Sequence, residues 1–188
     1  SQLLSYQPDP KWFLKDPEGI HGIGHVSRVL VLQELIALVI SKTTNIRLNR
    51  ECLRWAAVTH DARRFNDRYE PQHAVDAAFW VQSPEGPNIP DGLRKYVAYL
   101  DYWHTAHDKT IPRFTNELKV LKDSDSLDRV RFMGLSTKFL RYPIVKELFV
   151  RPAEQLFLLS FGYKRIKNIN DFEAVLIAAK ELGILEDK

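Results

Sequence analysis

The stretch Ala56-Ala57-Val58-Thr59-His60-Asp61-Ala62-Arg63-Arg64 places an imidazole and a carboxylate side by side at the end of an apolar run. An ionised carboxylate that is buried without a partner costs on the order of several kcal/mol. A divalent cation is the simplest partner for such a pair, and its remaining ligands must then come from other parts of the chain. The stretch therefore predicts a fold that gathers His and Asp side chains from several segments around one point.

Length and composition favour one soluble domain. The chain has 188 residues, of which 45% are hydrophobic and 27% charged, enough for a single core. The longest apolar-rich segment, residues 26–40, contains polar residues and is shorter than the roughly 20 residues of a membrane span. Cys52 is the single cysteine, and no signal-peptide pattern is visible near the start. We therefore expect a cytoplasmic protein without membrane contact.

Apolar residues three and four positions apart predict helices along most of the chain, and strand signals are nearly absent. The expected helices cover residues 22–40, 49–60, about 71–80, 91–105, a segment through Leu118 and Leu121, 144–161 and 171–182. The fold class is therefore all-α, a single globular helical domain of about seven helices.

The domain organisation follows from the same pattern. Residues 1–20 contain three prolines and predict an extended arm, pinned to the domain by Trp12 and Phe13. Residues 21–188 form the domain, with the candidate site within 21–128. The C-terminal helices within 129–188 either complete the core or form a homodimer contact, and the sequence leaves both open.

Histidines and carboxylates recur at the ends of the expected helices. The candidates are His21, His25, His60, Asp61, His73, His104, His107, Asp123, Asp125 and Asp128. A single His on an apolar helix face is more often a satisfied core residue than a ligand, but here one His opens or closes each of four successive helices. If these histidines lie alternately at the start and at the end of successive antiparallel helices, their side chains meet on one side of the bundle. We expect His107 to be exposed, and Asp123 and Asp128 to be solvated or to cap helices.

Three motifs carry a resemblance to a known family. They are Gly24-His25-Val26-Ser27-Arg28-Val29, the run from His60 to Asp67 followed by His73-Ala74-Val75-Asp76, and Lys122-Asp123-Ser124-Asp125-Ser126-Leu127-Asp128. Together they resemble the HD-domain superfamily of metal-dependent phosphohydrolases, and in particular a bacterial subgroup with uncharacterised members. The resemblance covers roughly residues 19–128 and implies an HD-type helical domain.

The resemblance also implies a ligand set. The first metal ion would be held by His25, His60, Asp61 and Asp125, with Asp123 as the alternative to Asp125. His73 and His104 would hold a second ion, with Asp61 bridging both. Without a second ion, His73 and His104 would bind phosphate or donate a proton, and His21 would face the substrate or support a ligand.

Nitrogen and oxygen ligands of this kind suit Mn, Fe, Co, Ni or Zn, with Mg also allowed, as one or two ions. The expected activity is hydrolysis of a nucleotide or another small phosphate ester, at a phosphomonoester or pyrophosphate bond, by a metal-activated water. Arg63 and Arg64 would bind the substrate and offset charge on the phosphate. Asp67 would orient one of these arginines or receive a proton, which completes the expected catalytic set with Asp61.

Two other functions fit the same residues. Some HD-domain proteins use a two-iron site with six such ligands to activate oxygen on a small alcohol or phosphonate. The other alternative is a non-catalytic module that senses a nucleotide and keeps its metal for structure. Nucleic acid is an unlikely partner, because the net charge is only +3 and the basic cluster lacks the interleaved aromatic residues of a single-strand platform. This cluster consists of Arg47, Arg50, Arg54, Arg63, Arg64 and Arg68.

Overall fold

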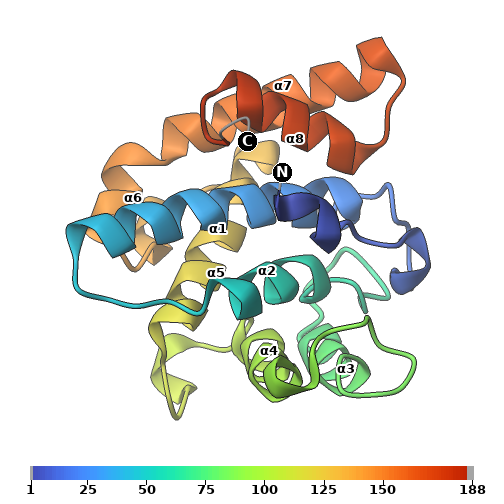
Figure 1. The fold of residues 1–188 in the computed structure, drawn as a ribbon, viewed down its shortest axis with the longest axis vertical. Coiled ribbons are helices and arrows are strands. Elements are labelled where there is room, and N and C mark those ends of the chain that lie inside the picture. The colour runs from blue at the N-terminus through green and yellow to red at the C-terminus, as the bar shows by residue number, and fades with distance from the viewer. Residues whose placement is uncertain (1, 186–188) are drawn as a thin grey trace.

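The computed structural model describes residues 2–185, and all of its regular elements are helical (Figure 1). The α-helices are α1 (Ile23–Thr43), α2 (Arg50–Thr59), α3 (Gln72–Trp80), α4 (Asp91–Trp103), α5 (Asn116–Leu127), α6 (Pro143–Leu148), α7 (Val150–Lys167) and α8 (Asp171–Glu181). The short 3-10 helices are η1 (Gln2–Tyr6), η2 (Pro10–Trp12), η3 (Asp108–Thr110), η4 (Asp128–Phe132) and η5 (Thr137–Phe139). The prediction of an all-α domain is confirmed. One expected helix, 144–161, is divided at Phe149, which ends α6 and begins α7.

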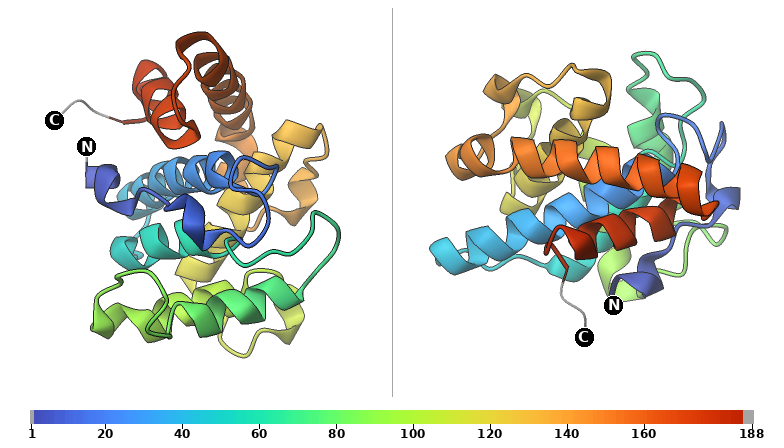
Figure 2. Two further views of the ribbon diagram at one scale, coloured as in Figure 1. Left: turned by 90° about the vertical axis from the view of Figure 1, so that its right-hand side faces the viewer. Right: turned by 90° about the horizontal axis from the view of Figure 1, so that it is seen from above.

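Helix α1 is the central element of the fold. It packs against α2 on one side and against α7 and α8 on the other, while α3 and α4 pair beyond α2 and α5 crosses behind (Figures 1 and 2). Most of its residues are buried, among them Leu30, Leu32 and Ile36 with no exposed surface. The other helices therefore surround α1 on nearly all sides.

The hydropathy of α1 reflects this central position. The helix has 21 residues, and its most apolar 18-residue window has a mean hydropathy of 1.7, so by length and composition it could cross a membrane. It is longer than the 15-residue apolar segment that the sequence suggested. However, 78% of its most apolar window is buried inside the fold, as expected for the core helix of a globular domain.

Capping residues fix where the site-bearing helices begin and end. Asn49 accepts a hydrogen bond from the backbone N–H of Cys52 and starts α2. At the other end of α2, His60 is the C-terminal cap residue, and His104 has the same place after α4. His25 and His73 lie in the first turns of α1 and α3. The expected alternation of helix ends is therefore present.

The turn before α1 requires glycine. The backbone N–H of Ile23 donates to the carbonyl of Pro17 at 2.7 Å, so the chain folds back tightly here. A Cβ atom on Gly22 would overlap that same carbonyl group. This close approach sets the position of His21, which precedes the turn residue.

The N-terminal arm differs from the expected extended segment. It forms the two 3-10 helices η1 and η2, and Leu3 and Tyr6 are its buried anchors. Tyr6 packs edge-on against Trp55 at 5.0 Å between ring centroids. Trp12 also packs edge-on, against Trp80 at 5.8 Å, but it is only partly buried. Leu3 and Tyr6 near the start therefore hold the arm together with the expected aromatic pair.

The core packing of α1 leads to a first prediction. Replacing Ile36 by valine should lower the free energy of unfolding by about 0.5–1.5 kcal/mol, because it removes one methyl group from a fully buried position. The same change at Ile166, which is 84% exposed on α7, should leave stability unchanged. Urea unfolding followed by circular dichroism measures both. Equal effects at the two positions would contradict the described burial.

Candidate metal centre

The carboxylate of Asp61 lies at the centre of the site, and its two oxygens face different histidines. Oδ2 is 2.9 Å from Nδ1 of His21 and 3.4 Å from Nε2 of His25. Oδ1 is 2.9 Å from Nε2 of His73 and 3.7 Å from Nε2 of His104. Asp61 is only 4% exposed. One buried carboxylate therefore faces two groups of imidazoles at once.

Four histidines turn their Nε2 atom toward this centre. In each of them Nδ1 faces an acceptor outside the centre, and a histidine that donates Nδ1–H leaves the lone pair of Nε2 free for a cation. The pairs are His25 with Oδ2 of Asp128 at 2.8 Å, His60 with the carbonyl of Ala57 at 3.0 Å, His104 with the carbonyl of Asp101 at 2.6 Å, and His73 with the carbonyl of Glu70. This is the usual arrangement around a protein-bound metal ion.

Two of these nitrogens have no hydrogen-bond partner among the described residues. They are Nε2 of His25 and Nε2 of His60, and both are fully buried. Buried polar atoms are almost always paired, so an unpaired one calls for an explanation. Ligand atoms of His21, His25, His60, Asp61, His104 and Asp125 also form three overlapping groups in which the atoms lie within 4.8 Å of one another. The described residues thus contain buried His and Asp clusters that could hold a metal ion.

Of the two candidate aspartates on α5, the structure turns Asp125 toward the centre. Its Oδ1 lies 3.4 Å from Nε2 of His25. Asp123 instead accepts hydrogen bonds from the backbone N–H groups of Arg141 and Tyr142, at 2.9 and 3.1 Å. Two residues along a helix is more than half a turn, so the two side chains point in different directions.

The expected surface solvation of Asp123 and Asp128 is wrong, because both are completely buried. Asp128 lies between two arginines. It accepts from Arg28 Nε at 2.5 Å and Nη2 at 3.0 Å, and from Arg131 Nη1 at 2.9 Å. The same carboxylate faces Nδ1 of His25, so this ion-pair cluster fixes the orientation of the imidazole.

Burial and charge set the protonation of the central groups. Burial would raise the pKa of Asp61, but the imidazoles of His60, His104 and His21 outweigh it and hold that pKa well below its usual range. Burial lowers the pKa of His60 to about 3. For His25, burial and Arg131 act to lower the pKa, but the nearby carboxylates of Asp125, Asp128 and Asp61 prevail and raise it to about 9. An ionised Asp61 and a neutral His60 are in the forms that bind a cation.

The adjacent arginines have different surroundings. Nη1 of Arg64 lies 3.4 Å from Oδ1 of Asp61 and 3.2 Å from the ring nitrogens of His73. Arg63 points the other way: it donates to the carbonyl of Trp12 at 3.2 Å and lies over the ring of Trp80 at 5.2 Å. The structure therefore brings Arg64 to the centre, whereas Arg63 joins the arm to α3.

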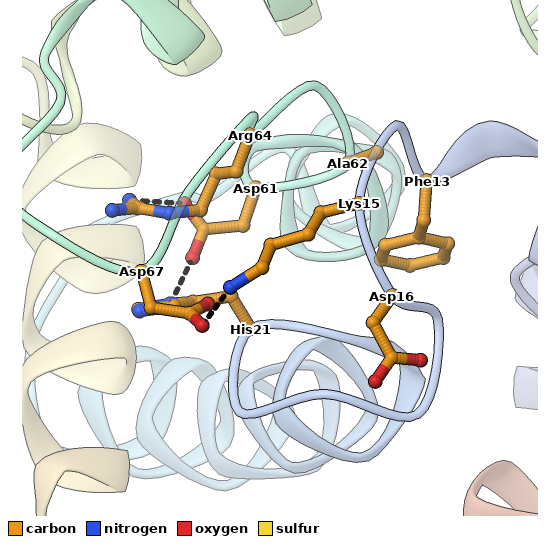
Figure 3. Close-up of a pocket in the computed structure, with 8 residues that line it drawn as sticks. All are labelled: Phe13, Lys15, Asp16, His21, Asp61, Ala62, Arg64 and Asp67. Atoms are coloured by element: carbon orange, nitrogen blue, oxygen red, sulfur yellow. Dashed lines mark hydrogen bonds and ion pairs between the residues drawn. The ribbon is translucent and has the colours of Figure 1, made fainter.

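Asp67 pairs with the N-terminal arm. Its carboxylate forms an ion pair with Lys15, and Figure 3 shows this pair beside His21 and Asp61. Among the described residues it forms no hydrogen bond or ion pair with either arginine for which an orienting role was expected, although Arg64 lines the same pocket. The pair lines a narrow pocket of about 10 Å³ next to Asp61, which is room for about one water molecule.

A much larger cavity, of about 910 Å³, opens at the centre. Asp61, His21, His73, His104 and Asp125 are among its lining residues. Eight of its lining residues are basic and five are acidic. The basic ones are Arg64, Arg68, Lys109, Lys122, Arg129, Arg131, Lys138 and Arg141. His107 is exposed, as expected, and also lines this cavity. An excess of cationic groups favours an anionic ligand.

The sequence interpretation missed two supporting groups. Arg28 and Arg131 anchor the carboxylate behind His25, and Lys122 donates to the carbonyls of His104, at 3.0 Å, and of Ala106. Lys122 is only 4% exposed. For Arg28, the signal is a charged residue one turn after His25 on a mostly apolar helix. No such signal marks Lys122, whose helix is rich in charged residues, or Arg131, which lies in η4.

Comparison of the chain with protein-family models, with curated proteins and with solved structures gives no match in any of the three.

Proposed function

We propose that this chain is a metal-dependent phosphohydrolase that hydrolyses a nucleotide or another small phosphate ester, as its resemblance to the HD-domain superfamily implies. The observation that carries the proposal is the position of Asp61. Its carboxylate faces two groups of histidines and lies at the wall of a cavity with eight basic side chains. A site for cations and a site for phosphate are therefore adjacent.

The residues fit one or two transition-metal ions. His25, His60, Asp61 and Asp125 would hold the first, and His73, His104 and Asp61 the second. The unpaired Nε2 atoms of His25 and His60 support this assignment, and the mixture of imidazole and carboxylate donors suits Mn, Fe, Co, Ni or Zn. When bound, such ions supply a water of lowered pKa and polarise a phosphoryl oxygen.

The chain's own side chains would position the substrate. Arg64 has one nitrogen near Asp61 and another that donates to the carbonyl of Arg68 at 2.7 Å, so its guanidinium group is held at the edge of the centre. A planar guanidinium matches two phosphate oxygens. His21 faces Asp61 through Nδ1, which leaves Nε2 as the ring atom that can accept or pass on a proton.

Phosphate release tests this proposal. Purified protein reconstituted with Mn²⁺, Fe²⁺, Co²⁺, Ni²⁺ or Zn²⁺ is incubated with a panel of nucleotides, sugar phosphates and pyrophosphate-linked compounds. We expect at least one compound to be hydrolysed, with activity lost on chelation and restored by the metal. Fully loaded protein that releases no phosphate from the whole panel would count against a hydrolase.

One observation favours a second candidate function. All six residues of the expected two-ion set lie around one point, and an oxygen-activating two-iron site needs the same ligands. Oxygen consumption by the iron-loaded protein with small alcohols or phosphonates, without phosphate release, would identify that activity instead. A module that only binds nucleotide would show neither reaction.

The two adjacent arginines provide a matched test of substrate binding. Replacing Arg64 by glutamine should raise KM by about 10- to 100-fold, because a charged hydrogen bond contributes about 1.5–3 kcal/mol. Replacing Arg63 by glutamine should leave KM unchanged, since its guanidinium lies on Trp80. Steady-state kinetics on the preferred substrate measures both. Similar KM values for the two variants would argue against a substrate contact by Arg64.

A further inference from the structure

The outward side of α7 carries an apolar pair between opposite charges. Glu154, Leu158, Phe161 and Arg165 are spaced four, three and four residues apart, which places them on one side of the helix. All four are exposed, Leu158 at 66% and Phe161 at 51%. We call these four residues the α7 seam. A large apolar pair with this exposure on a well-formed helix indicates a contact surface.

Residues 2–185, the part of the chain that the structure describes, leave this seam exposed. The buried side of α7 consists of Ala153, Leu156 and Ser160, and α7 packs with α8 in the outermost layer, beyond α1 (Figures 1 and 2). Glu154 and Arg165 form no ion pair with any residue that the structure describes. The guanidinium group of Arg165 lies over the ring of Phe161 of its own helix, 5.5 Å from the ring centroid. The seam is therefore available to a partner.

We propose that the α7 seam binds the α7 seam of a second copy of this chain, with the two helices antiparallel. A twofold axis between Leu158 and Phe161 puts Leu158 of each copy against Phe161 of the other. The same axis puts Glu154 of each copy against Arg165 of the other. A twofold interface must be complementary to itself, and the order acidic, apolar, apolar, basic meets this condition.

The helical spacing supports the same geometry. The spacing of four, three and four residues is that of alternating d and a positions in a heptad, the pattern that lets two helices pack side by side at a small angle. In the antiparallel arrangement each a residue faces a d residue of the other helix. Gly162, beside the seam, has open space where a Cβ would lie, so nothing there prevents close approach.

The charge pattern favours a second copy over a lipid surface. A helix that lies on an anionic membrane has basic residues on both sides of its apolar stripe, whereas Glu154 would face the lipid headgroups here. The seam spans about 16 Å, or three helical turns. Because this contact is small, we expect a dissociation constant in the micromolar range rather than a permanent dimer.

A charge-reversal experiment on the full-length chain tests this arrangement. Sedimentation equilibrium should show a monomer–dimer equilibrium for the wild type. Glu154→Arg and Arg165→Glu alone should each weaken the dimer by at least about tenfold, because each places like charges opposite one another twice. An equimolar mixture of the two variants should dimerise within about threefold of the wild type, because every pair is then opposite in charge.

Two further variants separate this surface from others. Leu158→Glu should abolish the dimer, and Phe79→Ser, which alters a 69% exposed residue on α3, should leave it unchanged. Circular dichroism confirms that each variant is folded. A wild type that stays monomeric at about 100 µM, single reversals without effect, or a mixture that fails to dimerise would each overturn the proposal. So would a monomeric wild type whose seam binds vesicles of anionic lipid.

Discussion

If the proposed function is right, replacing Asp61 by asparagine should prevent transition-metal binding and lower the proposed phosphohydrolase activity by at least about 1,000-fold. The carboxylate faces Nε2 of His25 through one oxygen and Nε2 of His73 through the other, so one substitution affects both proposed ion positions. Changing a residue that only supports a metal ligand typically costs 10–100-fold in affinity or activity, and a bridging ligand should cost more. Asparagine keeps the size of the side chain, which limits changes in packing.

Metal content after reconstitution and gel filtration, measured by mass spectrometry, gives the first readout, and turnover of the preferred substrate gives the second. Asp67→Asn is the matched control, because this aspartate lies six residues later and pairs with Lys15. We expect it to retain the metal. An Asp61→Asn protein that keeps its metal and its activity would show that this carboxylate is not the bridge.

Replacing Asp128 by alanine should destabilise the fold by about 3–5 kcal/mol, because it leaves buried charges without their partner. Arg28 and Arg131 both bind this carboxylate, their side chains are 9% and 6% exposed, and Nδ1 of His25 faces the same group. Burial acts to raise the pKa of Asp128, but Arg28, the hydrogen bond with His25 and Arg131 together hold it at about 2. The carboxylate is therefore ionised in the folded protein at neutral pH.

Urea unfolding of the metal-free protein measures this effect without a contribution from metal loss. Asp91→Ala is the control: its carboxylate also pairs with an arginine three residues later, Arg94, but its side chain is fully exposed. Its unfolding midpoint should move little. If Asp128→Ala were no less stable than Asp91→Ala, the cluster behind His25 would not contribute to the fold as described.

Helix ends could be predicted from the sequence because local chemistry sets them. Asn49 caps α2 and thereby fixes where His60-Asp61 lies, and Pro71 starts α3 just before His73. Apolar spacing identified the helices themselves. One exception was the break at Phe149: the apolar spacing of residues 144–161 does not show it, although Pro152 in the first turn of α7 has no N–H to donate to the carbonyl of Leu148, the last residue of α6. The short 3-10 helices of the arm were another.

Side-chain directions within short motifs could not be predicted in the same way. Arg63 and Arg64 are neighbours, yet one lies on Trp80 and the other faces Asp61. Which direction each takes depends on the arm, whose Trp12 carbonyl accepts from Arg63. Similarly, the burial of Asp128 depends on Arg28, a hundred residues earlier in the chain. Such contacts between distant segments leave no local pattern in the sequence.

Anomalous X-ray scattering from crystals of the metal-reconstituted protein tests the central claim most directly, because it locates each ion. We predict one peak at about 2.0–2.2 Å from Nε2 of His25, Nε2 of His60 and the carboxylates of Asp61 and Asp125. We predict a second peak at a similar distance from Nε2 of His73 and His104, with Asp61 between the two. Peaks at other residues, or none at this centre in protein shown to contain metal, would contradict the account.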